Sequence, residues 1–151
     1  MKRPIPKIRV FIDTNVLIAG LASSVGASAG VLDLCEAEVV EMVISRQVIV
    51  EADRNFSAKL PRFVGRYRQF VRNLRPVMVE DPRKNSVDRA ARVVGRKDAS
   101  ILAAAKESGV DFLITLDKKH FLSPRARRGV GLPVVTPAEF LQNFENLYLE
   151  E

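Results

Sequence analysis

VFIDTN (residues 10–15) and FLITLD (residues 112–117) each join a short run of apolar, mostly β-branched residues to an aspartate. Such runs predict short buried strands, here ending at Asp13 and Asp117. Strands that are apolar on both faces are typical of parallel sheets covered by helices on each side. These two segments therefore favour an α/β fold.

The rest of the chain alternates between strand and helix patterns. Strands are expected at Ile8–Ile12, Met42–Ile44, Val77–Val79, Phe112–Leu116 and Pro133–Val135. Helices are expected at Thr14–Leu21, Val31–Val39, a segment from the cap Ser45 through Phe56, an amphipathic stretch from Phe63 to Leu74, Val87–Val94, Asp98–Ser108, and a last helix capped by Thr136. This alternation predicts a three-layer α/β/α sandwich with a central parallel sheet of about four to five strands. We expect a single domain over residues 1–151.

Composition narrows the class of protein. Lys and Arg number 24 against 18 Asp and Glu, which gives a formal net charge of +6. A basic surface attracts nucleic acid through its phosphates. The single Cys35 cannot form an internal disulfide and is expected in the core. The sequence contains no run of about twenty apolar residues, and we expect no secretory signal because its basic first residues are not followed by an apolar segment and a cleavage site. We therefore expect a cytoplasmic protein without a membrane partner.

Acidic residues occupy particular places in this basic chain. Binding sites of open parallel sheets form at the carboxyl ends of the strands, where Asp13 and Asp117 lie. Glu51 lies about two turns into the helix after the second strand, and Asp98 opens the helix before the fourth. We therefore expect these carboxylates to converge. Each acid alone is more often a cap, a turn residue or a solvated side chain, so the joint pattern carries the interpretation.

Converging carboxylates repel one another unless protons or a cation neutralise them. Oxygen ligands without Cys or His select magnesium, manganese or calcium. Magnesium or manganese held in this way can activate water and clamp a phosphodiester, while nearby Lys and Arg hold the other phosphates. Asn15 and Thr115 adjoin the strand-end aspartates and are candidates to orient the carboxylates or bound water, or to act as local caps.

Several segments resemble the motifs of the PIN-domain family. FIDTNVLIAG (11–20) resembles the first motif and ISRQVIVEADRNF (44–56) the second. KDASILAAAKESGVDFLITLDKKHF (97–121) resembles the third and fourth, and PVVTPAEFL (133–141) the usual final strand and helix. The resemblance implies an α/β/α fold, Mg²⁺ or Mn²⁺ and cleavage of single-stranded RNA by Asp13, Glu51, Asp98 and Asp117. It also implies the VapC type of toxin, which is inhibited by a small antitoxin and is often a homodimer.

Some alternatives stay open at this point. The segment from Arg83 to Lys97 is longer than in many compact PIN proteins, so Asp81 and Asp88 remain candidates for the third acid. Asp98 is preferred because it opens the Ala-rich helix, as the family's third acid does. The competing functions are an inactive PIN-fold module that binds RNA or acts as a scaffold, and a carboxylate–metal nuclease acting on DNA.

Basic residues near the motifs are candidates for substrate contacts. They are Lys97, Lys118, Arg125, Arg127 and Arg128, the last three expected in a loop. The arginines between residues 62 and 75 are interpreted mainly as a solvated helix face. His120, the only histidine, is discounted as a chemical group because the family pattern does not need one.

Overall fold

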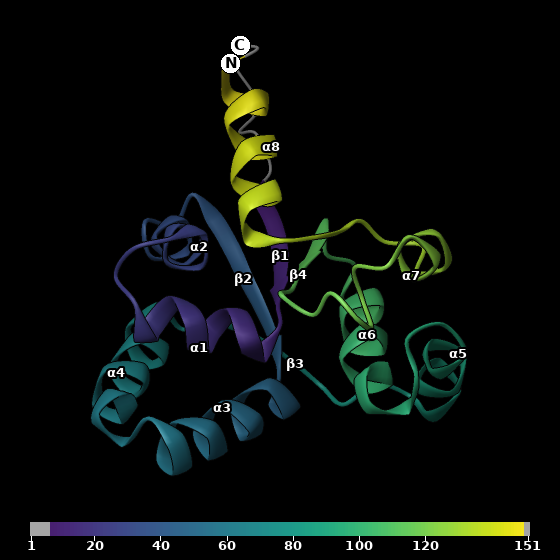
Figure 1. Ribbon diagram of the computed structural model, residues 1–151, viewed down its shortest axis with the longest axis horizontal. Coiled ribbons are helices and arrows are strands. Elements are labelled where there is room, and N and C mark those ends of the chain that lie inside the picture. Colours follow the sequence, from purple (N-terminus) through teal and green to yellow (C-terminus); the bar gives the residue numbers. More distant parts are fainter. Residues whose placement is uncertain (1–6, 150–151) are drawn as a thin grey trace.

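The computed structural model describes residues 7–149, in which five parallel strands form one sheet between layers of helices (Figure 1). The strands are β1 (Ile8–Ile12), β2 (Val40–Ser45), β3 (Val77–Val79), β4 (Phe112–Ile114) and β5 (Val134–Val135). Their order in the sheet is β3-β2-β1-β4-β5, and every neighbouring pair is parallel. The predicted fold class is confirmed.

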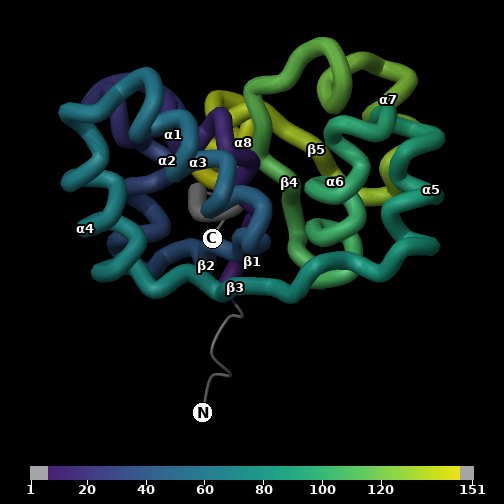
Figure 2. Tube along the Cα trace, turned by 90° about the horizontal axis from the view of Figure 1, so that it is seen from below, coloured from purple at the N-terminus to yellow at the C-terminus, as the bar shows by residue number. Residues whose placement is uncertain are grey.

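Helices cover both faces of the sheet. They are α1 (Thr14–Ala22), α2 (Ala27–Glu36), α3 (Arg46–Lys59), α4 (Val64–Leu74) after a 3-10 turn (Pro61–Phe63), α5 (Lys84–Val94), α6 (Arg96–Ser108), α7 (Pro124–Gly129) and α8 (Pro137–Leu149). Figure 2 shows α1 to α4 on one side of the strands and α5 to α7 on the other. No single helix among the described residues is long and apolar enough to cross a membrane; α1 and α2 meet that test only together, bent by 95°.

The core lies where these layers meet the sheet. Its largest fully buried side chains include Phe11, Phe56, Phe121 and Phe140. The expected amphipathic helix is present as α4, where Tyr67 is buried and stacks on Phe56 with ring centroids 4.8 Å apart. The arginines of this segment are exposed, as predicted. Burial of one helical stripe against the core is thus what fixes α4.

The expected element boundaries need three corrections. α2 spans Ala27–Glu36 rather than residues 31–39, and α5 begins at Lys84 rather than at Val87. The segment with Arg125 forms the short helix α7, because Ser123 Oγ accepts a hydrogen bond from the Ala126 N–H (3.2 Å) and a proline follows the cap. Ser45 precedes α3 but makes no side-chain cap, and its buried Oγ has no partner within residues 7–149.

Candidate active site

The ends of β1 and β4 lie side by side and place two of the acids. Ile12 pairs with Ile114, and the next residue, Asp13, donates its backbone N–H to the Ile114 carbonyl (3.1 Å). Thr115 continues β4 and donates its N–H to the Val135 carbonyl (3.0 Å). Sheet hydrogen bonding therefore fixes Asp13 and Thr115, and Asp117 follows two residues later.

Asp13 is a buried carboxylate held by several donors. Its side chain accepts hydrogen bonds from the Thr14 N–H (2.8 Å), the Thr115 hydroxyl (2.7 Å) and, at 3.4 Å, the Asn15 amide. Burial raises the pKa of Asp13 to about 6 despite the opposing effect of Thr115 and Thr14, and the negative charges of Asp98 and Glu51 add to the rise. Asp13 thus caps α1 and places at the sheet edge a carboxylate whose negative charge is disfavoured by burial and by the neighbouring acids.

Glu51 reaches the same edge from α3. One of its carboxylate oxygens accepts a hydrogen bond from the Thr14 hydroxyl (3.0 Å) and the other accepts one from the Gln47 amide (2.9 Å). Because Thr14 also contacts Asp13, the first turn of α1 joins the two acids. The backbone carbonyl of Glu51 accepts a hydrogen bond from the side-chain amide of Asn55 (2.8 Å), which keeps the Asn55 side chain on the same helix face as Glu51.

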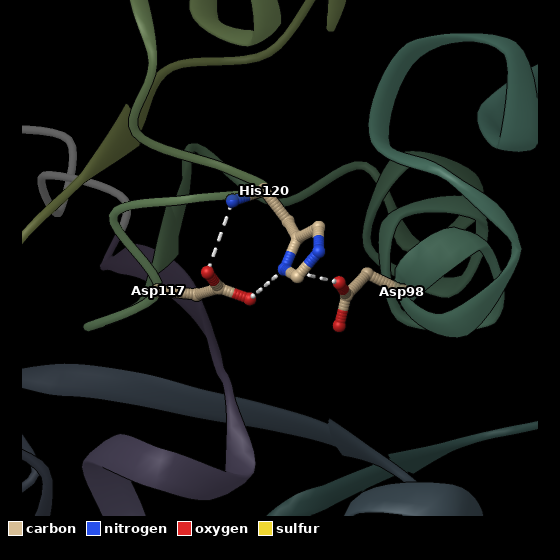
Figure 3. Close-up of side chains that lie close together, drawn as sticks. All are labelled: Asp98, Asp117 and His120. Atoms are coloured by element: carbon tan, nitrogen blue, oxygen red, sulfur yellow. Dashed lines mark hydrogen bonds and ion pairs between the residues drawn. The ribbon is translucent and has the colours of Figure 1, made fainter.

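Asp98, Asp117 and His120 form a second group beside the first (Figure 3). His120 Nδ1 lies 3.0 Å from Asp117 Oδ2 and 3.3 Å from Asp98 Oδ2. The longer contact is within ion-pair range but lacks hydrogen-bond geometry, so Asp98 Oδ2 is buried without a hydrogen-bond donor among the described residues. Burial raises the pKa of Asp98, the charge of Asp117 raises it further, and His120 and Lys97 oppose the rise.

A single cavity of about 600 Å³ joins the two groups. Its lining comprises Asp13, Thr14, Asn15, Ile18, Glu51, Arg54, Asn55, Lys97, Asp98, Asp117, Lys119 and His120. Negative charge is therefore concentrated among polar and basic side chains. The carboxylates of such a cavity can bind a hard metal cation, while the Lys and Arg side chains of its wall can bind an anionic ligand.

The sequence profile of the PIN domain family matches residues 9–119, which includes both groups of acids. The chain belongs to the PIN domain family. No curated protein matches the chain significantly.

Solved structures show the same PIN-like fold. VapBC2 from Rickettsia felis, solved bound to a DNA fragment from its promoter, matches with a TM-score of 0.63 at 16% identity, over 85% of this chain and 98% of that chain. PAE2754 from Pyrobaculum aerophilum matches with a TM-score of 0.59 at 18% identity, over 89% of this chain and 88% of that chain. At this identity the similarity is one of fold.

The structure places Asp98 in the cavity with the other three predicted acids of the PIN motifs. Asp81 is exposed and lines a different cavity, and Asp88 is exposed on α5. Thr115 lies beneath the cavity, where its hydroxyl also accepts the N–H of Asp117 (3.0 Å). The geometry thus separates Asp98 from the alternatives that the sequence left open.

The predicted basic contacts divide into two sets. Lys97 lines the cavity, whereas its wall after β4 contains Lys119 rather than Lys118. Arg127 forms a bidentate pair with Glu139 (3.1 and 2.9 Å), so it ties α7 to α8 instead of facing the cavity. Arg125 and Arg128 are exposed on α7 and do not line the cavity.

Sequence reasoning passed over some residues that the PIN cavity contains. Arg54 and Asn55 follow Glu51 by one helical turn, a spacing that would have identified them. His120 follows Asp117 by three residues, and the turn between them brings its ring to two of the acids. His120, which its residue type and motif alone do not single out, therefore lies in the cavity wall.

Proposed function

We propose that this protein is a divalent-metal-dependent endoribonuclease that cleaves single-stranded RNA. One observation carries the proposal: carboxylates from four separate segments line a single cavity together with basic side chains. Burying acids close together is unfavourable in the absence of a cation, and a module without chemistry has no physical need for it. Membership in the PIN domain family supports a nuclease over an inactive scaffold.

The donor set fits a hard divalent cation. Asp13, Glu51, Asp98 and Asp117 would hold Mg²⁺ or Mn²⁺ through oxygen atoms, which are the ligands both ions accept. The buried Asp98 Oδ2, which has no hydrogen-bond donor within residues 7–149, supports this reading. A bound cation supplies charge neutralisation and Lewis-acid activation at this position.

The surrounding residues position the acids and the substrate. The hydroxyls of Thr115 and Thr14 orient Asp13 and Glu51, which leaves fewer rotamers to fix when substrate arrives. Arg54 and Lys97 come from different helices in the cavity wall and are suited to hold phosphates on either side of the cleaved bond. The exposed Lys118, Arg125 and Arg128 are proposed to contact RNA that extends beyond the cavity.

Cleavage of matched RNA and DNA strands tests the activity. We expect the purified protein to cut single-stranded RNA with Mg²⁺ or Mn²⁺, to spare DNA of the same sequence, and to lose activity with a chelator. Asp117→Asn should lower the rate by about 100-fold or more because it removes a charged ligand. Asp88→Asn removes an exposed acid outside the cavity and should leave the rate unchanged. RNA binding without cleavage would favour the scaffold function, and equal cleavage of DNA would refute the RNA specificity.

We further propose that the protein is the toxin of a toxin–antitoxin pair. The support is the fold similarity to VapBC2 of Rickettsia felis, nearly all of whose matched chain is covered. Expression in bacteria should stop growth, and Asp117→Asn should not. Co-expression of a small protein encoded by a neighbouring gene should restore growth and form a stable complex with the chain. Unimpaired growth with active wild-type protein would contradict the toxin role but not the nuclease activity.

A further inference from the structure

His120 is held at the acidic cavity by the turn that follows β4. Its backbone N–H donates to Asp117 Oδ1 (3.0 Å), and the next residue, Phe121, is fully buried. These two contacts fix the backbone on either side of the ring. The imidazole therefore lies between Asp98 and Asp117 (Figure 3).

The distances around His120 Nδ1 suit a shared cation. A ligand atom from each of Asp98, Asp117 and His120 can be chosen so that all lie within 4.8 Å of one another. Adjacent ligands of an octahedral ion with bonds of about 2.1 Å are separated by about 3.0 Å. Nδ1 lies 3.0 Å from one carboxylate oxygen and 3.3 Å from the other, so two of the three ligand separations are close to this value.

A hydrogen bond alone does not account for this arrangement. The Nδ1 atom can donate a single proton, which the 3.0 Å contact directs to Asp117. Asp98 Oδ2, although close to the same nitrogen, then stays buried without a donor in the described part of the chain. A cation between the three residues would satisfy both carboxylates.

We propose that His120 is a nitrogen ligand of this site and that it shifts the metal preference from Mg²⁺ toward Mn²⁺ and later first-row ions. This inference rests on the metal dependence proposed above. Imidazole strengthens binding of transition ions, in the order of their general affinity for nitrogen ligands, whereas Mg²⁺ gains little from it. The family pattern of four acids by itself gives no such preference.

Spectroscopy of bound Mn²⁺ tests the ligand directly. His120 is the only histidine, so in tag-free protein a nitrogen coupling of imidazole type, measured by pulsed EPR, can come from no other residue. We expect the coupling in the wild type and its loss in His120→Asn. The asparagine amide can replace the hydrogen bond to Asp117, and it offers no imidazole nitrogen that would favour Mn²⁺ over Mg²⁺, so the variant separates the two roles of the ring.

Calorimetric titration with Mn²⁺ and with Mg²⁺ gives an independent readout. The ratio of the Mn²⁺ affinity to the Mg²⁺ affinity should fall by about tenfold or more in His120→Asn. Asp88→Asn, outside the cavity, should keep the wild-type ratio. Bound Mn²⁺ without nitrogen coupling in the wild type, or an unchanged ratio in a folded His120→Asn, would overturn the inference and leave the metal site intact. Failure of the wild type to bind either ion would overturn both the inference and the proposed metal dependence. The wild-type coupling decides the question even if the variant does not fold.

Discussion

Asp13 is a residue whose negative charge is proposed to bind metal but destabilises the metal-free fold. Burial raises its pKa from the usual 3.8 to about 6. Its contribution to stability is therefore fully present below about pH 4 and is lost as the pH rises through about 6, by on the order of 3 kcal/mol without metal. In Asp13→Asn this loss should be absent while RNA cleavage is abolished. Urea unfolding of both proteins with a chelator, at several pH values across this window, measures the difference.

Three results would contradict this prediction. Equal pH dependence of the two proteins would show that hydrogen bonding to Thr14 and Thr115 fully offsets the burial of Asp13. An Asp13→Asn variant that does not fold would show that the residue acts mainly as the cap of α1. Cleavage at the wild-type rate would exclude Asp13 from the mechanism.

Thr115 is the buried residue that connects the two groups of acids. Its hydroxyl donates to Asp13 (2.7 Å) and accepts the N–H of Asp117 (3.0 Å). Thr115→Val keeps the shape but removes both interactions, so metal affinity should fall about tenfold and stability by about 1–3 kcal/mol. Thr115→Ser should restore most of both. Calorimetry and thermal unfolding measure these effects, and equal behaviour of the valine and serine variants would contradict the positioning role.

The sequence indicated the four candidate acids because strand ends, helix starts and spacing along a helix are local features. It could not place His120, because the ring orientation depends on a turn in which Asp117 Oδ1 accepts two backbone N–H groups. The same turn decides that Lys119 rather than Lys118 lines the cavity. Side-chain direction after a strand is thus a tertiary property, whereas residue type and spacing are visible in the sequence.

Among the elements, α7 and α8 are joined by one network. The Thr136 hydroxyl accepts the Glu139 N–H and the Thr136 N–H donates to the Glu139 carboxylate, both at 3.0 Å, so the expected cap of α8 is confirmed as a capping box. Arg127 binds the same carboxylate. Its guanidinium holds the pKa of Glu139 near 2, with help from Thr136.

Removing the Arg127 guanidinium should therefore lower the stability of the fold without changing the rate of RNA cleavage. Arg127→Gln should lower the free energy of unfolding by about 1 kcal/mol, since the pair is partly exposed and screened by solvent. Because the pKa of Glu139 is lowered, this stability is present above its usual 4.5 and is lost as the pH falls toward 2. Thermal unfolding at neutral and acid pH checks this. If folded Arg127→Gln cleaves RNA more slowly than the wild type, Arg127 contacts the substrate after all.

Long helices were easier to predict from the sequence than short ones. α6 and α4 were clear because they run for several turns, whereas α7 has 6 residues and too little periodicity to register. The start of α2 was misplaced because its first residues are small. Gly30, in that helix, lies against Leu141 of α8, where an added Cβ would be 3.0 Å from the leucine. Such a close approach is known only once the helices are packed.

The whole molecule combines a formal charge of +6 with an acidic cavity. We expect binding of single-stranded RNA to weaken strongly with salt, by about tenfold or more between low and moderate ionic strength, because cations are released from the phosphates. Added Mn²⁺ or Mg²⁺ should strengthen binding by neutralising the carboxylates. Fluorescence anisotropy of the wild-type protein with a cleavage-resistant RNA analogue measures both effects. Affinity that is independent of salt would contradict the electrostatic part of the proposal.

The sequence predicted a parallel sheet but not its strand order. That order places β1 between β2 and β4, so that Asp13 and Asp117 meet although they are far apart in the chain. Local patterns indicate which segments are strands, whereas their order depends on which crossings bury the most apolar surface. The convergence of the acids was therefore an inference from parallelism alone.

The strand order also determines when the proposed nuclease site can assemble during synthesis. β1 leaves the ribosome well before its sheet neighbour β4 and Asp117. Until β4 has emerged, the growing polypeptide lacks one wall of the cavity and cannot assemble the four acids. A fragment that ends before β4 should therefore lack the proposed nuclease activity, which an RNA cleavage assay of the truncated chain can check.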